Sequence, residues 1–334
     1  MKTMFTPSYK ALQDNGELWS RADKLMSMLA SCNICPKDCR NNRLDNRIAA
    51  CYSGLLPIVS SYCIHHGEEP LLSGSQDAGN ENGVGNIFFG NCNLRCVYCQ
   101  NYEISQNHRL EIRNEVTIER LAEIMLELQD MNVNAVGLVS PTHFVPQIVS
   151  ALDIAAGKGF QLPLVYNTNS YDSIEVLRLL DGIIDIYLPD IKYSEDDYGY
   201  RYSKIKEYVS HSRASLSEMH RQLGSSLIVE NGLLKKGLLV RHLILPNDLA
   251  GSRSTLEFIA GLDKNISVSV MSQYYPVHKA LETGLLSRNI RESEYDKVLL
   301  LMDELGLENG FVQEFESEGY YRPDFSDRQE PFKR

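Results

Sequence analysis

Three closely spaced cysteines form the most informative stretch of the chain. Cys92, Cys96 and Cys99 follow a short apolar run, with three and then two residues between them. Three thiolates can hold three corners of a cubane iron–sulfur cluster and leave the fourth iron open to a small molecule. A fourth cysteine would close the site and leave only electron transfer. The alternatives are a structural zinc knuckle or a chance cluster.

A second group of cysteines precedes this stretch. Cys32, Cys35, Cys39 and Cys51 lie within twenty residues of one another in a polar segment. Four thiolates at this spacing can close a tetrahedral site around zinc or hold an auxiliary iron–sulfur cluster, and the spacing does not choose between them. The eighth cysteine, Cys63, stands apart and is interpreted as a buried thiol.

Composition narrows the class of protein. The 334-residue chain has a net charge of -11, which argues against broad binding to nucleic acid or to an anionic membrane. No apolar run is long enough to span a membrane, and the N-terminus lacks an apolar signal core. We therefore expect a cytoplasmic protein, in which clustered thiols act as metal ligands rather than as disulfides.

From residue 85 onward, strand and helix patterns alternate. Strands are predicted at 86–90, 135–139, 163–166, 183–188, 237–245 and 266–271. Repeated βα units require a parallel sheet with helices outside, and six strands are too few for a closed eight-stranded barrel. The predicted fold is α/β, an open partial (β/α)6 barrel with a Cys-rich N-terminal extension.

Three parts of the chain follow from this pattern. Residues 1–84 form the extension, residues 85–280 the partial barrel, and residues 281–334 a C-terminal helix and tail. Within the extension, 8–30 is predicted to be one helix with Trp19 in the core. A further short strand is predicted near 309–315, and the polar end from Arg322 is predicted to be frayed.

In parallel sheets of this kind, functional residues lie where strands end at their carboxyl edge. That rule selects polar residues after each predicted strand. They are Ser140, Thr142, His143, Asn167, Thr168, Asn169, Asp190, Lys192, Arg241, His242 and His278. The stretch from His65 to Pro70 is predicted to form a loop over the same site.

The stretch from Asn91 to Asn101, with Tyr98 just before the last cysteine, resembles the signature of the radical S-adenosylmethionine (SAM) enzymes. It is most similar to the branch that includes the activating enzyme of pyruvate formate-lyase. With its Cys-rich segment and the sequence His66-Gly-Glu-Glu-Pro70, the whole chain looks like the uncharacterised relatives of that enzyme. The resemblance covers the fold and the cofactors, but it does not name a substrate.

The resemblance implies a chemistry. Cys92, Cys96 and Cys99 would hold a 4Fe-4S cluster, and SAM would chelate the open iron. Reductive cleavage of SAM would then give a 5′-deoxyadenosyl radical that abstracts hydrogen from a substrate, with a glycine of a partner protein as the leading candidate. The alternatives are radical modification of a small molecule or nucleotide, and a non-catalytic iron–sulfur protein that transfers electrons. An electron donor such as flavodoxin or ferredoxin is implied, whereas nucleic acid and membrane are not expected as partners.

The resemblance also implies cosubstrate contacts. Tyr98 would lie near the adenine, Asp190 and Lys192 near the ribose, Arg241 near the methionyl carboxylate, and His278 at the same end of the barrel.

One element departs from the family pattern. Where the family has Gly-Gly-Glu-Pro to hold the methionyl amine, this chain has Val139-Ser-Pro-Thr-His143. The carboxylate is missing, so Ser140 and Thr142 are the candidate oxygen donors, with Asn167 on the next strand.

Overall fold

The computed structural model describes residues 5–75, 79–313, 315 and 323–332. Its centre is one sheet with the order β1-β2-β3-β4-β5-β7-β8-β9, and β6 pairs with β7. The strands are β1 (Val59–His65), β2 (Val84–Phe89), β3 (Val136–Val139), β4 (Leu164–Thr168), β5 (Ile186–Pro189), β6 (Ile228–Glu230), β7 (Leu233–Leu243), β8 (Ser267–Met271) and β9 (Gly310–Val312).

The sheet is mostly parallel. All neighbours from β2 to β9 along the main order are parallel, while β1 pairs antiparallel with β2 and β6 antiparallel with β7. The six predicted strands correspond to β2, β3, β4, β5, β7 and β8, so the open partial barrel is confirmed. The strand expected near 309–315 is β9, whereas β1 and β6 were not predicted.

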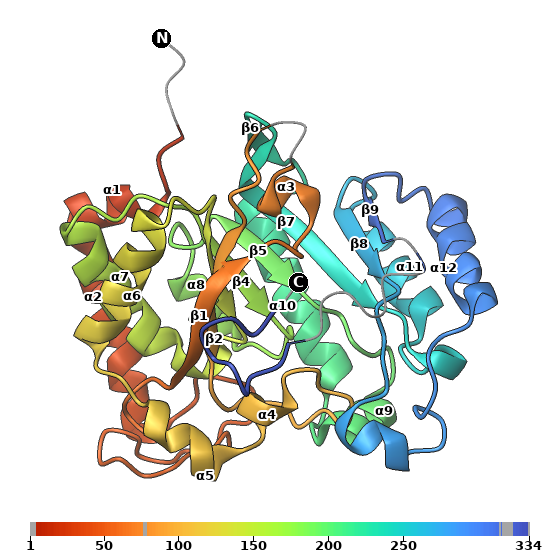
Figure 1. The fold of residues 1–334 in the computed structure, drawn as a ribbon, viewed down its shortest axis with the longest axis horizontal. Coiled ribbons are helices and arrows are strands. Elements are labelled where there is room, and N and C mark those ends of the chain that lie inside the picture. Colours follow the sequence, from red (N-terminus) through yellow and green to blue (C-terminus); the bar gives the residue numbers. More distant parts are fainter. Residues whose placement is uncertain (1–4, 76–78, 314, 316–322, 333–334) are drawn as a thin grey trace.

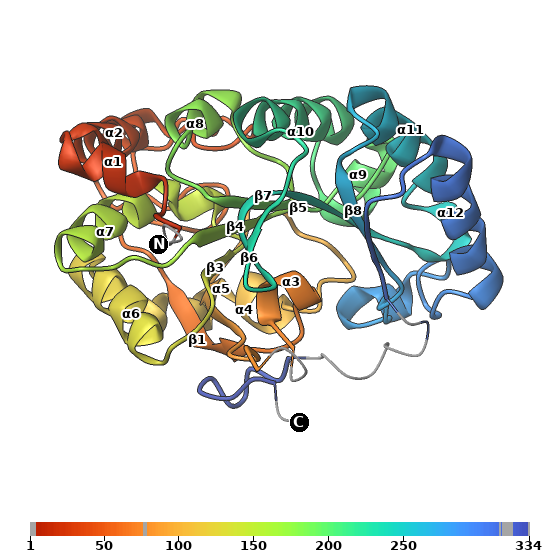
Figure 2. The ribbon, with the colours of Figure 1, turned by 90° about the horizontal axis from the view of Figure 1, so that it is seen from above.

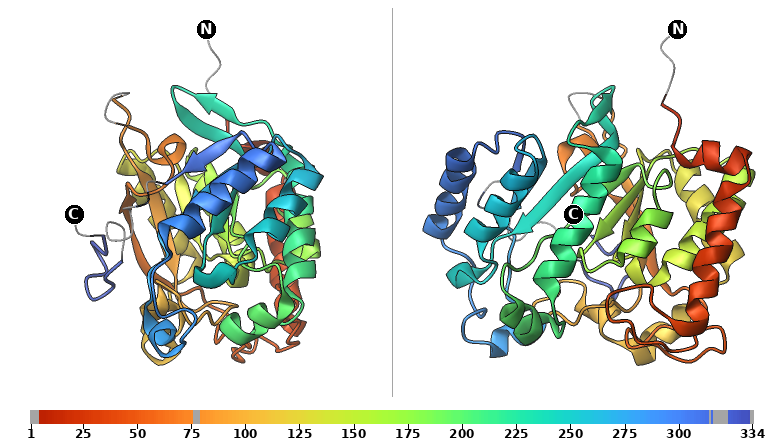
Figure 3. Two further views of the ribbon diagram at one scale, coloured as in Figure 1. Left: turned by 90° about the vertical axis from the view of Figure 1, so that its right-hand side faces the viewer. Right: turned by 180° about the vertical axis from the view of Figure 1, so that it is seen from behind.

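Helices cover the outer side of the curved sheet (Figures 1 and 2). Seen from behind, α10 lies across that outer face (Figure 3). The helices are α1 (Tyr9–Asp14), α2 (Glu17–Ser27), α3 (Pro70–Ser73), α4 (Tyr102–Ser105), α5 (His108–Glu111), α6 (Ile118–Asp130), α7 (Val145–Gly157), α8 (Ile174–Leu179), α9 (Asp196–Ser203), α10 (Tyr208–Leu223), α11 (Ser252–Leu262) and α12 (Glu292–Leu305).

Helix α6 shows how the sequence specifies these elements. The side chain of Thr117 accepts a hydrogen bond from the Arg120 amide and caps the first turn, as the sequence predicts. Leu121, Met125 and Leu128 recur at helical spacing and are fully buried. In the described part of the chain, no helix is long and apolar enough to cross a membrane.

The predicted single helix over 8–30 is wrong. It is broken into α1 and α2 at Gly16, which adopts a left-handed backbone with φ 79° that a continuous helix does not permit. Trp19 is 64% exposed and not in the core. Its neighbours Leu18 and Ala22 occupy the buried face, and one helical residue turns the next side chain about 100° away.

The prediction of a frayed end is also wrong for residues 323–332, which pack along β1 (Figure 2). The Ser61 hydroxyl donates to the Arg328 carbonyl (2.5 Å), and the Arg328 guanidinium pairs with the fully buried Glu111 (2.7 Å). Phe325 and Phe332 both contact the ring of Phe88 on β2. This segment therefore covers the β1 side of the sheet.

Candidate active site

The cluster loop, residues 90–101, begins where β2 ends. All of β2 is buried, which positions the loop at the carboxyl edge of the sheet. Asn91 takes a left-handed backbone with φ 63°, and its amide donates to the Ile104 carbonyl (2.9 Å). Its side-chain amide donates to the Tyr52 carbonyl (2.9 Å). The turn that presents the cysteines is thus held by one contact from the N-terminal extension and one from the segment that follows the loop.

Each of the three sulfurs in this loop contacts a polar group. The Leu94 amide donates to the Cys92 sulfur (3.4 Å), and the Ser203 hydroxyl donates to the Cys96 sulfur (3.0 Å). The Cys99 sulfur lies 3.3 Å from the Ser105 hydroxyl. Hydrogen bonds to cysteine sulfurs are one of the ways in which proteins adjust the potential of an iron–sulfur cluster.

Burial makes the thiols of Cys96 and Cys99 poor acids by themselves. It raises the pKa of Cys96 to about 12 and also raises the pKa of Cys99, and neighbouring cysteines add to both shifts. Thiolates in such a setting require a positive metal centre, so the donor set fits an iron–sulfur cluster. Within the described residues, no three His, Cys, Asp or Glu side chains converge as ligands of one ion. Cubane ligation differs, because each thiolate binds a separate iron.

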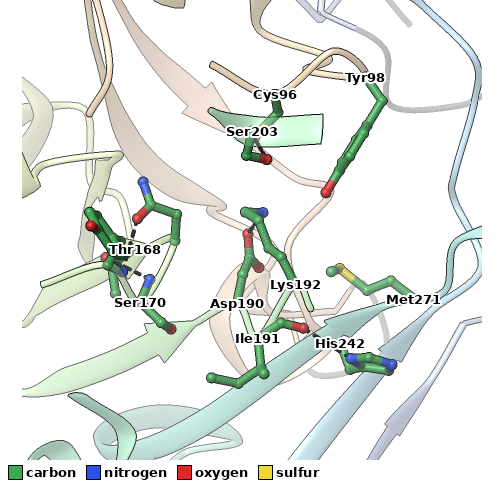
Figure 4. A network of polar contacts seen from close by, with 12 residues as sticks. Cys96, Tyr98, Thr168, Ser170, Asp190, Ile191, Lys192, Ser203, His242 and Met271 are labelled. Atoms are coloured by element: carbon green, nitrogen blue, oxygen red, sulfur yellow. Dashed lines mark hydrogen bonds and ion pairs between the residues drawn. The ribbon is translucent and has the colours of Figure 1, made fainter. Parts of the chain in front are cut away.

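The three cysteines border one cavity of about 210 Å³. Six of the eight predicted cosubstrate residues line the same cavity, namely Tyr98, Ser140, Asn167, Asp190, Lys192 and Arg241. They come from the cluster loop and from the ends of β3, β4, β5 and β7. Figure 4 shows Asp190 and Lys192 pointing into the space next to Cys96 and Tyr98.

Asp190 and Lys192 form an ion pair of 2.6 Å inside this cavity. Burial opposes the charge of Lys192, yet its pKa is raised because Asp190 and Cys96 outweigh that effect. Conversely, the Lys192 ammonium lowers the pKa of Cys96 and Cys99 against the larger effect of burial. Lys192 is therefore a cation close to the sulfurs.

Two of the predicted residues lie elsewhere. The Thr142 hydroxyl donates to the buried carboxylate of Asp172 (2.8 Å), which also accepts from Thr168 and Tyr166. The ring of His278 stacks on Tyr102 with 4.9 Å between centroids. Neither residue lines the cavity of the three cysteines.

A second chamber of about 440 Å³ adjoins this cavity, and we call it the inner chamber. The two share several wall residues, among them Asn167, Arg241 and Met271. The predicted loop from His65 to Pro70 forms part of its wall and places Glu68 and Glu69 beside Arg241. Glu69 binds Arg241 through both oxygens (2.8 and 2.6 Å), and Glu68 pairs with the same guanidinium.

The N-terminal cysteines gather beside the cluster loop. The Cys39 thiol donates to the Cys32 carbonyl (3.9 Å), and Cys35 interacts electrostatically with Cys39 and Cys51. Burial raises the pKa of Cys35 to about 12. Cys63, in contrast, packs against the aromatic cluster around Phe88.

Arg95 connects the two groups of cysteines. Its guanidinium donates to the carbonyls of Cys92 (2.9 Å), Leu94 (3.1 Å) and Ser105 (3.0 Å) in and near the cluster loop. It also donates to the Cys51 carbonyl (3.3 Å). One side chain thus ties the N-terminal segment to the turn that carries the cluster cysteines.

Buried Arg43 lies beside the N-terminal cysteines and lowers the pKa of Cys32 against the larger opposing effects of Cys39 and burial. Its guanidinium is fully buried and donates to the carbonyls of Gly54 (2.8 Å) and His143 (2.7 Å). Among the described residues, Nη2 has no hydrogen-bond partner and no carboxylate pairs with this cation.

Sequence reasoning missed several residues of the site. Ser203 comes from α9, more than one hundred positions from Cys96, and no local pattern marks it. The Tyr193 hydroxyl hydrogen-bonds with the hydroxyls of both Tyr98 (2.7 Å) and Ser203 (2.7 Å), and so fixes the ring of Tyr98 within the cluster loop. Glu68 and Glu69 were placed in a covering loop, but their pairing with Arg241 could not be foreseen.

The family comparison agrees with this geometry. Residues 86–223 match the model of the radical SAM superfamily. The chain is 31% identical over 299 residues to the uncharacterized protein MJ0674 of Methanocaldococcus jannaschii, a match that covers 84% of this chain and 77% of that protein. A solved structure of TYW1 with a lysine-pyruvate adduct bound has a TM-score of 0.42 and 13% identity, covering 72% of this chain and 80% of that one. On the family match, this chain belongs to the radical SAM superfamily.

Proposed function

We propose that this protein cleaves SAM reductively and uses the product to abstract hydrogen from a substrate in the inner chamber. The observation that carries the proposal is the single cavity shared by Cys92, Cys96, Cys99 and six predicted cosubstrate residues. When bound, a 4Fe-4S cluster with SAM on its open iron supplies the 5′-deoxyadenosyl radical.

The chain's own residues bind and orient the cosubstrate. Tyr98 is held by Tyr193 and presents an aromatic face for the adenine. The Asp190 carboxylate can accept from the ribose hydroxyls. We assign the methionyl carboxylate to Lys192 rather than to Arg241, because Lys192 is the cation that acts on the cluster sulfurs, whereas Arg241 is already paired with two glutamates.

Ser140 and Asn167 are the proposed contacts of the methionyl amine. Both line the cavity, and the Ser140 amide donates to the Asn167 carbonyl (2.9 Å), which fixes the two strand ends relative to one another. The left-handed backbone of Ser140 (φ 55°) turns the chain directly after β3. Thr142 is committed to Asp172 and is left out of this set.

The test is anaerobic formation of 5′-deoxyadenosine by the reconstituted, dithionite-reduced protein. We expect formation in the wild type and in Cys63→Ala, because Cys63 lies outside both groups of cysteines. We expect none in Cys92→Ala. Absence of product from a wild type that carries its full iron and sulfide would overturn the proposal. A physiological electron donor such as flavodoxin or ferredoxin is proposed in place of dithionite.

A small-molecule substrate fits the inner chamber better than a glycine of a partner protein. The segment 323–332 lies along β1, with Phe332 and Pro323 in the chamber wall. A loop of a large partner would have to displace this segment and the ion pair between Arg328 and the buried Glu111. Hydrogen abstraction from a glycine of a partner protein, which the sequence of the cluster loop favours, therefore requires residues 323–332 to move away from β1. A glycyl radical signal in a partner protein mixed with the reduced enzyme would establish it.

We also propose a second metal centre at Cys32, Cys35, Cys39 and Cys51, either an iron–sulfur cluster, in which each thiolate binds its own iron, or zinc, for which the four sulfurs would have to converge more closely than they do in this structure. Four thiolates on a divalent zinc or on an oxidised cubane carry a net negative charge. Arg43, buried beside them and without a carboxylate partner in the described residues, supplies the matching positive charge. Metal and sulfide analysis of the Cys92→Ala, Cys96→Ala, Cys99→Ala triple variant tests this. Retention of metal supports it, and a metal-free protein contradicts it.

A further inference from the structure

The inner chamber has a charge imbalance in its wall. Glu68, Glu69 and Arg241 are the Asp, Glu, Lys or Arg residues among its described lining. One guanidinium faces two carboxylates, so one negative charge is not compensated within the described wall.

Both carboxylates are buried beside Arg241. Their side chains are 9% and 7% exposed. Burial opposes ionisation of Glu68, but the Arg241 guanidinium and the hydrogen bond from Asn86 outweigh it and hold the pKa of Glu68 well below its usual range. Protonation therefore does not remove the excess charge near neutral pH.

The neighbours of Glu68 are fixed by packing. The Asn86 amide donates to Glu68 (2.7 Å) from the inner face of β2. Asn86 can occupy this place because residue 137 on the adjacent strand is glycine: a Cβ there would lie 2.0 Å from the Asn86 oxygen. Arg241 and Asn86 hold the Glu68 carboxylate in place, and Gly137 leaves the space that the Asn86 side chain needs.

His65 does not supply the missing positive charge. Burial lowers its pKa, and the charge of Arg241 lowers it further against the opposing effect of Glu68. Its ring packs on Phe332, with 4.1 Å between centroids. A neutral imidazole leaves the balance of the chamber at one excess negative charge.

The remaining walls are aromatic, aliphatic and amide side chains. Phe88, Phe311 and Met271 offer apolar contacts, while Gln273 and Gln313 offer neutral hydrogen-bonding groups. Isolated charge in a buried site costs free energy unless it is paired. A ligand that brings a positive charge to the glutamates and an apolar body to the aromatic walls satisfies both parts of the chamber.

We propose that the inner chamber takes a small substrate carrying a cationic group, of the ammonium or amidinium class, which lies against Glu68 and Glu69. The inference rests on the proposed function in one respect, that the chamber beside the cluster cavity is the substrate site. Arg241 is then a positioning residue that holds both carboxylates at the boundary between chamber and cluster cavity.

The test is equilibrium binding to the reconstituted, unreduced protein at fixed ionic strength, measured by calorimetry. The probes are phenethylammonium, phenethyl alcohol and 3-phenylpropionate, which share an aromatic body and differ in charge. We expect the ammonium to bind roughly tenfold or more tightly than the alcohol, and the carboxylate to bind most weakly. If the wild-type protein binds the three probes equally, or binds the carboxylate most tightly, the inference is overturned before any variant is measured.

Glu68→Gln sharpens the test because it removes the excess charge, keeps the size of the side chain and leaves Arg241 its two bonds to Glu69. The ammonium preference should disappear in this variant. Glu119→Gln, an exposed glutamate at the start of α6, makes the same change in net charge and should keep the preference. Persistence of the preference in a folded Glu68→Gln protein contradicts the proposal.

The binding experiment and the SAM-cleavage assay can fail independently of one another. If the ammonium preference is found but the reduced enzyme forms no 5′-deoxyadenosine, the proposed function fails and the charge inference stands. If 5′-deoxyadenosine forms and the preference is absent, the reverse holds.

Discussion

The two groups of cysteines differ in what their sulfurs meet. Cys92, Cys96 and Cys99 border a cavity, and their sulfurs contact a backbone amide and two hydroxyls. In the N-terminal group, sulfurs interact with one another and with the buried cation of Arg43. The first arrangement leaves room for a ligand on the metal, and the second closes upon itself. The difference fits the two proposed roles, with the first group as the ligands of a reactive cluster and the second as the ligands of a structural metal.

The largest expected effect separates the two groups by activity. Cys96→Ala should lower 5′-deoxyadenosine formation by roughly a thousandfold or more, because the cluster supplies the reaction and the protein only orients it. Cys39→Ala should lower 5′-deoxyadenosine formation by no more than roughly 10–100-fold, as expected for a residue that positions the cluster ligands without binding the cluster itself. Chromatographic assay of the reduced proteins measures both. Equal losses would show that the N-terminal group takes part in the chemistry.

The second effect separates them by stability. Cys39→Ala should lose the N-terminal metal and lower the free energy of unfolding, because metal-binding free energy is part of folding free energy in such a site. Urea unfolding monitored by circular dichroism measures the loss. Cys63→Ala is the matched control, since it removes a thiol of similar burial that lies outside both groups. If Cys39→Ala and the control have equal free energies of unfolding, the N-terminal cysteines do not stabilise the fold through a metal.

A third prediction concerns the counter-charge. Arg43→Met should cost about 3–5 kcal/mol in the metal-loaded protein, because it leaves a buried anionic centre without its partner. In the Cys39→Ala background the same change should cost less, since the anion is gone. The difference is the coupling energy of a double-mutant cycle. Zero coupling in urea unfolding would mean that Arg43 serves only the carbonyls of Gly54 and His143.

The smallest effect tests the residue between the two groups. His143 donates through Nε2 to the Gly90 carbonyl (2.9 Å) just before the cluster loop, and its own carbonyl accepts from Arg43. Burial lowers its pKa to about 3. The folded state therefore resists protonation while the unfolded state accepts it below about pH 6.5, so stability falls as pH falls through this window.

His143→Gln should remove about 2 kcal/mol of this acid-induced loss at pH 5, measured as the difference in unfolding free energy between pH 7 and pH 5. An unchanged slope in His143→Gln would show that this imidazole is not neutral in the fold.

The sequence by itself determined the parallel strands of the partial barrel and the resemblance to the radical SAM enzymes. Alternating strand and helix patterns gave the six parallel strands, and the spacing of Cys92, Cys96 and Cys99 identified the cluster loop. Both signals are local, since they depend on periodicity and on neighbours in the chain. The carboxyl-edge rule extended this to Asp190, Lys192 and Arg241, because parallel strands bring their ends to one edge.

Only the tertiary structure decided which side chains meet. It committed Thr142 to Asp172, brought Ser203 to Cys96, and laid residues 323–332 along β1. It also gave Arg241 two carboxylates from a loop more than 170 residues away in sequence. These contacts join segments with no shared periodicity, so they follow from packing and charge pairing in three dimensions, which residue spacing along the chain does not encode.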